Sequence, residues 1–412
     1  RGLGDVYKRQ PNGLRLVHYE DTSTQMVALN IVYDVGARDE HPEHTGFAHL
    51  FEHLMFGGSA HIPDYDTPLQ LAGGENNAWT NNDITNYYLT VPKPNVETAF
   101  WLESDRMLEL AFSEQSLEVQ RGVVMEEFKQ RCLNQPYGDV GHLFRPLAFR
   151  VHPYRWPTIG KELSHIEQAT LDEVKSFFYR FYAPNNAVLA VTGNISWDET
   201  VKLTEKWFAP IPRRDVPVRQ LPQEPEQTQE RRLTVERNVP LDALFMGYHM
   251  CSREGADYYA FDILSDILSN GRSSRLNRRL VQEQNIFSGI DAYISGTRDA
   301  GLLQISGKPA AGVSLEQAEA AVRKELEELQ RSPVDGQELE KVKNKFESTQ
   351  IFGNINYLNV ATNLAWFELT GKAEDIDLEV ERYRSVTTEQ LHTVAQRTFC
   401  ESNAVVLYYK LS

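Results

Sequence analysis

The sequence predicts an α+β fold made of two homologous α/β-sandwich domains, each with a mixed or antiparallel sheet covered by helices. Three observations support this prediction. The chain has 412 residues, which at about 150 residues per domain corresponds to two or three domains. Strand-like and helix-like segments follow in the same order in both halves, which indicates an internal duplication. Between the halves lies a segment, 209–231, that cannot build a core.

The N-terminal half begins with a turn signal, Asn12-Gly13, followed by apolar, β-branched runs that are typical of buried strands. Strands are predicted at 14–20, 26–33, 87–91 and 187–192. Helices, recognised by their apolar periodicity, are predicted at 47–56, 95–111, 115–134, 171–182 and 197–208. Gly57-Gly58 ends the first helix, and Gly73-Gly74 predicts a turn. Strands followed by helical runs favour sheets that are covered on one face.

Five prolines among Gln, Glu and Arg predict that 209–231 is an extended linker. Beyond it, strands are predicted at 243–249, 301–307 and 404–409, and helices at 257–269, 276–284, 315–331, 336–350 and 387–398. The predicted domains are therefore 11–208 and 232–412. Residues 1–10 are polar and fit neither domain. We expect them to be a cloning or sequence-assembly scar, which leaves the natural N-terminus and an upstream signal peptide open.

Composition excludes several classes of protein. With 42 Lys and Arg against 58 Asp and Glu, the formal charge is −16, which disfavours binding to nucleic acids. Cys132, Cys251 and Cys400 form no C-x-x-C pair, so neither a thiolate metal cage nor a disulfide framework is expected. No run approaches about 18 apolar residues, so no membrane span is predicted. We expect a cytoplasmic protein, and the uncertain N-terminus leaves a periplasmic or exported one open.

The strongest local signal is His49-Leu50-Phe51-Glu52-His53, an inverted H-x-x-E-H motif on the first predicted helix. Residues four apart share one face of a helix, so His49 and His53 can bind one ion, with Glu52 near the same face. Imidazole nitrogens suit zinc, and a carboxylate that is not a ligand can serve as a general base beside it. The flanking residues are largely apolar, which favours a metal over a helix that carries two histidines by chance.

A catalytic zinc needs a third protein ligand. The best-placed run is 121–127, R-G-V-V-M-E-E, on the predicted helix 115–134. Glu126 or Glu127 can reach the metal, but not both, because successive helical residues point about 100° apart. The residues alone leave open which one binds, and whether the pair simply forms a solvated surface.

These motifs resemble the pitrilysin/insulinase family of M16-type zinc peptidases, close to its bacterial and mitochondrial-processing branch. The resemblance covers nearly the whole chain from Leu14. Besides the run at 121–127, the matching stretches are V-G-A-R-D-E at 35–40, G-F-A-H-L-F-E-H-L-M-F-G-G at 46–58, G-G-E-N-N-A-W-T at 73–80, H-P-Y at 152–154 and T-I-G at 158–160.

The resemblance implies that zinc is bound by His49, His53 and Glu127, while Glu126 is solvated. It implies a zinc-dependent endopeptidase that hydrolyses peptide bonds of short or unfolded polypeptides, with metal-activated water and Glu52 as general base. Domain 11–208 would hold the zinc and domain 232–412 no metal, the two forming half of a clamshell chamber. Where the family often has a glutamate behind the ligands, this chain has Gln120, whose amide can still hydrogen-bond on that helix face.

The resemblance also implies a substrate-binding edge strand. Its residues would be Asn77, Ala78, Trp79 and Thr80. An extended peptide adds to such an edge through main-chain hydrogen bonds, and Asn77 can donate to the region of the scissile carbonyl. From residue types alone, Gly73-Gly74 and Asn76-Asn77 are equally typical of a plain turn.

A second departure concerns partners. Family members that act alone carry an Arg, and a Tyr seven residues later, in the C-terminal half; the aligned positions here are Val281 and Ser288. We therefore expect a heterodimer with a homologous subunit that supplies the pair, with a homodimer as the alternative. The rival function is a non-catalytic structural or core subunit of a larger assembly, although such subunits usually lack the zinc motif.

Overall fold

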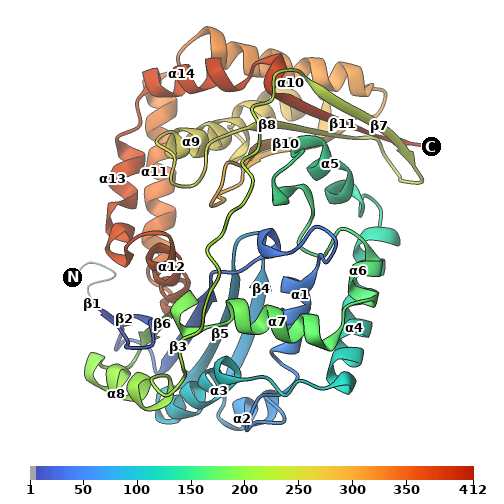
Figure 1. The fold of residues 1–412 in the computed structure, drawn as a ribbon. Coiled ribbons are helices and arrows are strands. Elements are labelled where there is room, and N and C mark those ends of the chain that lie inside the picture. The colour runs from blue at the N-terminus through green and yellow to red at the C-terminus, as the bar shows by residue number, and fades with distance from the viewer. Residues whose placement is uncertain (1–5) are drawn as a thin grey trace. The chain divides into compact units, whose positions relative to one another are not determined.

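The structure, a computed structural model, describes residues 6–412 (Figure 1). Its contacts divide the chain into two compact units, each with its own sheet covered by helices, as the sequence predicts. The first unit contains the described chain up to Leu133, together with Trp156–Leu221 and Ile351–Leu378. The second unit contains Asn134–Arg155, Pro222–Gln350 and Glu379–Ser412. Both units thus draw on both halves of the chain.

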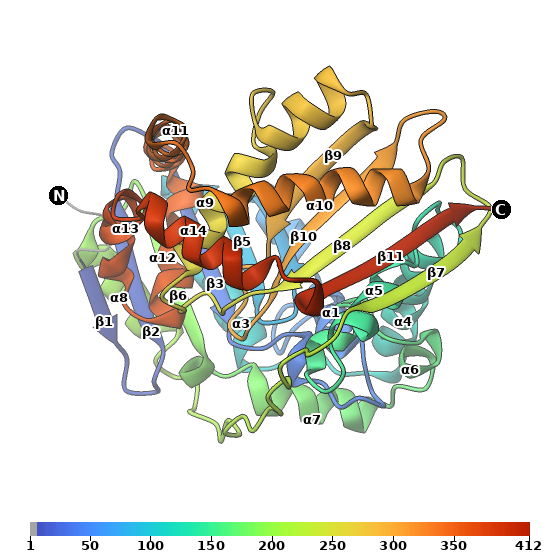
Figure 2. The same cartoon turned by 90° about the horizontal axis from the view of Figure 1, so that it is seen from above.

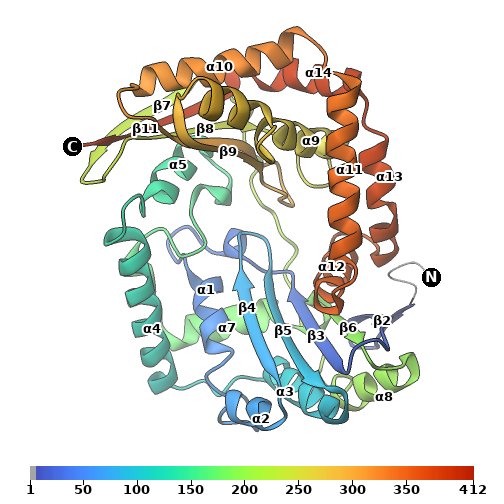
Figure 3. The same cartoon turned by 180° about the vertical axis from the view of Figure 1, so that it is seen from behind.

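The sheet of the first unit has six strands in the order β1-β2-β6-β3-β5-β4. β2 and β6 are parallel and the other neighbours antiparallel, so the sheet is mixed. The strands are β1 (Val6–Arg9), β2 (Arg15–Glu20), β6 (Ala187–Gly193), β3 (Met26–Tyr33), β5 (Thr85–Pro92) and β4 (Glu75–Thr80). β3 is buried along nearly its whole length, which explains its continuous apolar run. Figure 3 shows β4 at the edge beside β5.

Helices cover one face of this sheet and bury the main core of the unit, which includes Leu29, Leu89 and Leu189. The covering helices are α1 (Phe47–Leu54), α3 (Val96–Leu108), α4 (Glu114–Phe128), α7 (Leu171–Phe181) and α8 (Trp197–Trp207). Two shorter helices complete this layer: α2 (Asp66–Leu71) and α6 (Leu163–Glu167).

A helix from much later in the chain covers the other face. α12 (Tyr357–Thr370) buries Val360 and Leu364 against Val17, Ala28 and Val188 of the sheet. Since side chains alternate along a strand, these sheet residues point away from the main core. Both faces are thus covered, where the sequence indicated one, because no helix was predicted at 357–370.

The sheet of the second unit repeats this topology. Its order is β7-β11-β8-β10-β9, with β7 and β11 parallel and the other pairs antiparallel, which matches β2-β6-β3-β5-β4. This match supports the predicted internal duplication. The strands are β7 (Arg231–Arg237), β11 (Ala404–Leu411), β8 (Ala243–His249), β10 (Leu302–Pro309) and β9 (Phe287–Ile294).

The second sheet is also covered on both faces. α9 (Tyr258–Ser269), α10 (Leu315–Arg331) and α14 (Thr388–Thr398) pack on one face. Figure 2 shows α10 and α14 beside each other across the strands. α5 (Val140–Ala148), which follows α4 in the chain, covers the other face with Phe144 and Ala148. The remaining helices are α11 (Gly336–Gly353) and α13 (Glu379–Arg384).

Several segments differ from the predictions. Val6–Arg9 form β1 at the sheet edge, so this part of the N-terminal segment belongs to the fold, whereas residues 1–5 lie outside the described chain. Within the described stretch 212–230 there is no helix or strand, and β7 begins at Arg231. The predicted helix at 276–284 is a π-helix, Asn277–Glu283, and α4 continues into another, Lys129–Leu133. No helix in the described chain is long and apolar enough to cross a membrane.

Candidate metal centre

Helix α1 presents the two histidines of the H-x-x-E-H motif on one side. Its apolar side chains anchor it in the core of the first unit: Phe47, Leu50, Phe51 and Leu54. His49 and His53, one turn apart, have ring centroids 4.9 Å from each other. His49 is buried and His53 half-buried, so the pair lies at the boundary between core and solvent.

Glu127 completes the group from α4, which is held against α1 by buried Leu117 and Val124. Its Oε2 lies 3.3 Å from Nε2 of His49 and 3.3 Å from Nε2 of His53. Two donors that bind a tetrahedral zinc at about 2.0 Å lie roughly 3.3 Å apart, so this spacing fits such an ion. Two imidazoles and one carboxylate also match the ligand set of catalytic zinc sites. Among residues 6–412, no other group of three possible ligands is found.

Protonation also suits metal binding. The hydrogen bond from His49 lowers the pKa of Glu127 to about 2, against the effect of partial burial. Burial lowers the pKa of His53, and the neighbouring His49 lowers it further. At neutral pH, Glu127 is therefore ionised and His53 neutral, the forms in which both side chains bind a metal.

Arg131 holds the outer oxygen of the Glu127 carboxylate. Its Nη2 lies 2.7 Å from Oε1, while Oε2 faces the histidines. Arg131 lies in the π-helix that follows α4, one turn after Glu127. Sequence reasoning missed this contact, although a Glu and an Arg four residues apart on a helix are a recognisable pair.

A buried carboxyl group anchors the start of α1. Gly46, which precedes the helix, has a φ of 86°, and no side chain at that position caps the helix. Glu40 instead accepts hydrogen bonds from Gly46 N at 3.0 Å and Ala48 N at 2.8 Å, and Trp156 Nε1 donates to it at 3.0 Å. Burial raises the pKa of Glu40 to about 8, although these three donors oppose the shift. No spacing rule connected Glu40 with the helix at the level of sequence.

Glu52 lies half-buried on α1, outside the three-residue donor group. Its Oε2 accepts a hydrogen bond from Thr80 Oγ1 at 2.5 Å. Thr80 is the last residue of β4, so this hydrogen bond ties the carboxylate beside the donor group to the edge strand. The expected base and the expected substrate strand are thus in direct contact.

The four residues of the expected substrate strand fall on two faces of β4. Ala78 and Thr80 are half-buried, and Ala78 packs against the main core. Asn77 and Trp79 are exposed, because alternate residues of a strand point to opposite faces. Oδ1 of Asn77 accepts a hydrogen bond from Ala78 N at 2.8 Å, so the amide NH2 group of this exposed side chain is left as a donor. The segment is a strand, and not only the turn that its residue types also allowed.

Other predicted residues are not part of the group. Gln120 is half-buried on α4 and forms no hydrogen bond to either histidine within the described chain. Glu126 is exposed, and its Oε1 accepts a hydrogen bond from Nε2 of Gln130 at 3.5 Å. In the second unit, Val281 packs against the core, and the hydroxyl of Ser288 donates to Lys308 O at 3.2 Å.

Comparisons with known proteins identify the family of this chain. Residues 15–139 match the family described as "Insulinase (Peptidase family M16)", and residues 168–346 match "Peptidase M16 inactive domain". Zinc protease PqqE of Helicobacter pylori is 26% identical over 405 residues, which are 97% of this chain and 91% of the relative. The uncharacterized zinc protease YmxG of Bacillus subtilis is 25% identical over 399 residues, 96% of each chain.

A solved structure, described as a protease from Helicobacter pylori, has the same fold. Its TM-score is 0.93 at 26% identity, and the match covers 98% of this chain and 99% of that chain. The two family matches cover successive parts of the chain, and the relatives span nearly all of it. The chain therefore belongs to peptidase family M16, the insulinase family.

Proposed function

We propose that this chain is a zinc-dependent endopeptidase that hydrolyses peptide bonds of short or unfolded polypeptides. The observation that carries the proposal is the convergence of His49, His53 and Glu127 beside Glu52, a carboxylate that is not part of the donor group. Two relatives that match nearly the whole chain are named zinc proteases, which supports the same chemistry.

Each side chain has a distinct task in this mechanism. Zinc bound by His49, His53 and Glu127 would polarise the scissile carbonyl and acidify the attacking water. Glu52 accepts the proton of that water and later passes it to the leaving amine. Thr80 holds Oε2 of Glu52, so the carboxylate is oriented before the substrate arrives. Arg131 fixes the outer oxygen of Glu127 and thereby keeps the inner oxygen on the histidines.

Strand β4 offers a way to hold an extended substrate. It is the last strand of its sheet, and within residues 6–412 it pairs with β5 alone, so its other edge can accept a peptide as an added strand. Asn77, whose Oδ1 already accepts from Ala78 N, would donate from its amide NH2 group to the carbonyl region of that peptide. Since Thr80 belongs to this strand and binds Glu52, a peptide along β4 runs past the base. This arrangement suits unfolded chains, because a folded one has no free strand to add.

Three matched Glu→Gln variants test the proposal. Glu52→Gln should keep one zinc per chain and reduce kcat by roughly 100- to 10,000-fold, because it removes only the base. Glu127→Gln should lose both zinc and hydrolysis, and Glu126→Gln, at an exposed neighbouring position, should lose neither. The measurements are zinc content of the purified chain and cleavage of an unstructured peptide. Full activity in Glu52→Gln would remove this residue from its role.

The rival function, a non-catalytic core subunit, needs no metal. The donor group is complete in this chain and Glu52 accompanies it, which favours the peptidase. Zinc content separates the two functions, because a core subunit should purify without stoichiometric zinc.

We also propose that a homologous subunit completes the active enzyme. Val281 packs into the core and Ser288 bonds to the backbone of β10, so neither side chain takes the place of the Arg and Tyr expected there. The partner would supply that pair. Cleavage should therefore be slow with the purified chain and rise at least about tenfold when the partner that co-purifies from the native source is added. Full activity of the chain as a monomer would contradict both a homologous partner and a homodimer. Full activity of a homodimer would exclude the need for a homologous partner.

A further inference from the structure

Three tyrosine hydroxyls are buried in the core of the first unit without a hydrogen-bond partner. They belong to Tyr33 at the end of β3, Tyr87 in β5 and Tyr182 directly after α7. Each side chain is at most 1% exposed, and no group of the protein within residues 6–412 bonds to any of the three hydroxyls. None of them has a task in the proposed peptidase mechanism.

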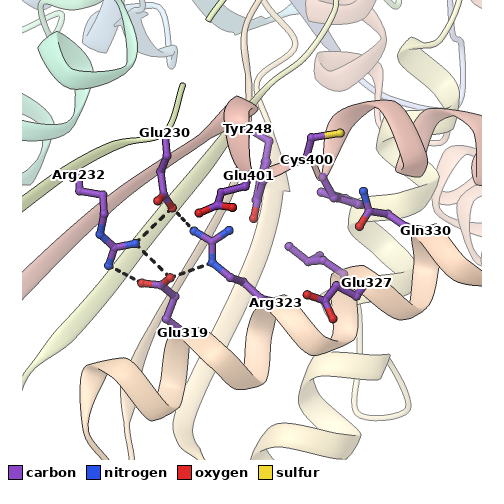
Figure 4. A pocket seen from close by; sticks show the side chains of 11 residues that line it. Glu230, Arg232, Tyr248, Glu319, Arg323, Glu327, Gln330, Cys400 and Glu401 are labelled. Atoms are coloured by element: carbon purple, nitrogen blue, oxygen red, sulfur yellow. Dashed lines mark hydrogen bonds and ion pairs between the residues drawn. The ribbon is translucent and has the colours of Figure 1, made fainter. Parts of the chain in front are cut away.

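The second unit shows how buried polar groups are usually satisfied. In the pocket that β8 and α10 line, Glu319 lies 2.6 Å from Arg232 and 2.8 Å from Arg323, and both arginines also pair with Glu230 (Figure 4). Burial alone would raise the pKa of Glu319, but hydrogen bonds from both arginines and from Tyr408 outweigh it and lower the pKa to about 2. Among the described residues of this unit, no fully buried side-chain oxygen or nitrogen lacks a partner. The unpaired tyrosines thus distinguish the unit that carries the candidate metal ligands.

Packing brings the three tyrosine rings together on one face of the sheet. Tyr33 pairs with Thr85 across β3 and β5, so Tyr87, two residues further on, is its diagonal neighbour on the same face (Figure 3). The ring centroid of Tyr33 lies 5.9 Å from that of Tyr87 and 5.1 Å from that of Tyr182. The rings are therefore neighbours, although their hydroxyls do not bond to one another.

The tyrosines lie next to helix α1 and close to Glu52. Tyr182 stacks on Phe51, the residue before Glu52, with ring centroids 5.0 Å apart. Burial raises the pKa of Tyr87 and of Tyr182 well above the usual 10, and the charge of Glu52 adds to the rise at both. At neutral pH the tyrosines are therefore protonated O–H donors, and the carboxylate of Glu52 is an acceptor in their neighbourhood.

The neighbouring side chains do not replace the missing partners. Thr85 lies close to Tyr182, but its hydroxyl donates to a backbone carbonyl at 2.8 Å. The guanidinium of Arg106 lies over the face of the Tyr87 ring, 4.6 Å from its centroid, and donates to Glu103 at 2.6 Å and 3.0 Å. Since an unpaired buried hydroxyl costs free energy, three of them side by side indicate a polar ligand between them.

We propose that one or more buried water molecules bridge the three tyrosine hydroxyls and bond to the carboxylate of Glu52. A buried water typically makes about three hydrogen bonds, and the hydroxyls and the carboxylate supply these partners. Oε2 of Glu52 already accepts from Thr80, so the water holds the carboxylate from the side of the core. This role rests on the proposed peptidase function, and it makes Tyr87 and Tyr182 positioning residues for the base.

Structure and stability test for the water without reference to activity. A high-resolution crystal structure of the zinc-loaded chain should show water within hydrogen-bonding distance of at least two of the hydroxyls. Phe at position 33, 87 or 182 should lower the urea midpoint, because the bridging water loses a partner; a hydroxyl that is simply unpaired would leave the midpoint unchanged or raise it on removal. Tyr65→Phe, which removes a hydroxyl bonded to Glu103, is the control that lowers it. Absence of the water, or midpoints that stay the same or rise, would overturn the proposal.

Kinetics test the positioning role. In Tyr87→Phe and Tyr182→Phe, kcat should fall about three- to tenfold while KM and zinc content stay the same, because the base remains but is oriented less well. Tyr408→Phe, which removes a bonded hydroxyl in the second unit, should keep its kcat. An unchanged kcat in both variants would overturn the positioning role. If the wild-type chain is inactive, the peptidase proposal fails, whereas the crystal structure and the urea midpoints still decide whether the water is bound.

Discussion

In the first unit, the helix that follows β3 carries His49, Glu52 and His53; in the second, the corresponding helix after β8 is α9, which carries Asp262 and Asp266. In the described chain, these two aspartates do not take part in a group of possible metal ligands. Asp262 accepts a hydrogen bond from Tyr383, and burial raises the pKa of Asp266 to about 6. No partner element brings a third ligand to them, since the one donor group found in residues 6–412 is that of the first unit.

The comparison of α1 and α9 shows that the two units share a topology and differ in the few side chains that could bind a metal. Both sheets repeat one strand order, and both helices bury an apolar face in a core. The polar side chains on the remaining face, together with Glu127 on α4, decide whether a metal can bind. Topology therefore defines the positions available, and a few substitutions define the function.

The largest expected effect tests whether one unit alone holds the metal. In a His49→Ala/His53→Ala variant, zinc should fall from about one ion per chain to none, because two of the three ligands are gone. His392→Ala, in the second unit, should retain the zinc. Elemental analysis after dialysis measures both. If the double variant still held about one zinc per chain, the metal would be bound outside the His49, His53 and Glu127 group, and the contrast between the two units would be wrong.

A smaller effect is expected from the anchor of α1. At about pH 9, where the carboxyl of Glu40 is ionised, Glu40→Gln places an amide N–H against backbone N–H donors, and zinc affinity should fall roughly tenfold, equivalent to about 1.4 kcal/mol, as expected when one buried hydrogen bond is lost. Competition with a chelator measures the affinity. The exposed Glu43→Gln provides a control. Unchanged affinity in Glu40→Gln would mean that α1 holds its histidines without this anchor.

A few-fold effect is expected from Thr80→Val, which keeps the shape of the side chain and removes its hydroxyl. Glu52 then loses the hydrogen bond that orients it, so kcat should fall about three- to tenfold while zinc content stays the same. A change in zinc content instead of kcat would show that β4 supports the metal and not the base.

A last comparison separates the two units by the pH dependence of their stability. Glu40 has a folded pKa of about 8, above its usual 4.5, so the folded chain binds a proton that the unfolded chain lacks between pH 8 and 4.5. Its contribution to stability is therefore lost as pH rises through this range. Glu319 has a folded pKa of about 2, so its contribution is lost as pH falls from 4.5 to 2.

Urea midpoints measured across pH check both signs. Glu40→Gln should flatten the upper range, and Glu319→Gln the lower range. A variant that flattens neither range would show that the other titrating groups dominate.

Much of the fold follows from local pattern. β3 and β8 begin and end where the apolar runs predict, because buried strands need unbroken apolar sequence. β7 and β9 were not predicted. Both lie at the edge of their sheet, where many of their residues are polar and exposed, so their sequences resemble those of loops. α5 contains Pro146, which argues against a helix, and α12 has little amphipathic pattern because it is buried on a broad face.

Only the part of the candidate site that depends on the spacing of residues within one helix could be predicted from the residues themselves. The four-residue separation of His49 and His53 is visible in the sequence, but the choice of Glu127 over Glu126 needed the family resemblance. The contacts of Thr80 with Glu52 and of Glu40 with α1 join residues that no helix or strand period relates. Such contacts depend on tertiary packing, which a single sequence does not display.

α5, from the N-terminal half of the chain, covers the second sheet, and α12, from the C-terminal half, covers the first sheet. This arrangement has a consequence for the synthesis of the protein. The first unit has all six of its described strands and its main helical layer once residue 221 has emerged from the ribosome, but the cover for Val17, Ala28 and Val188 comes from residues 357–370. For most of translation that face of the sheet is exposed apolar surface, open to chaperones and to aggregation. A fragment cut at the linker would retain the ligands and still carry this unprotected face. The nascent chain thus reaches a fully covered first sheet only in the last stage of its synthesis.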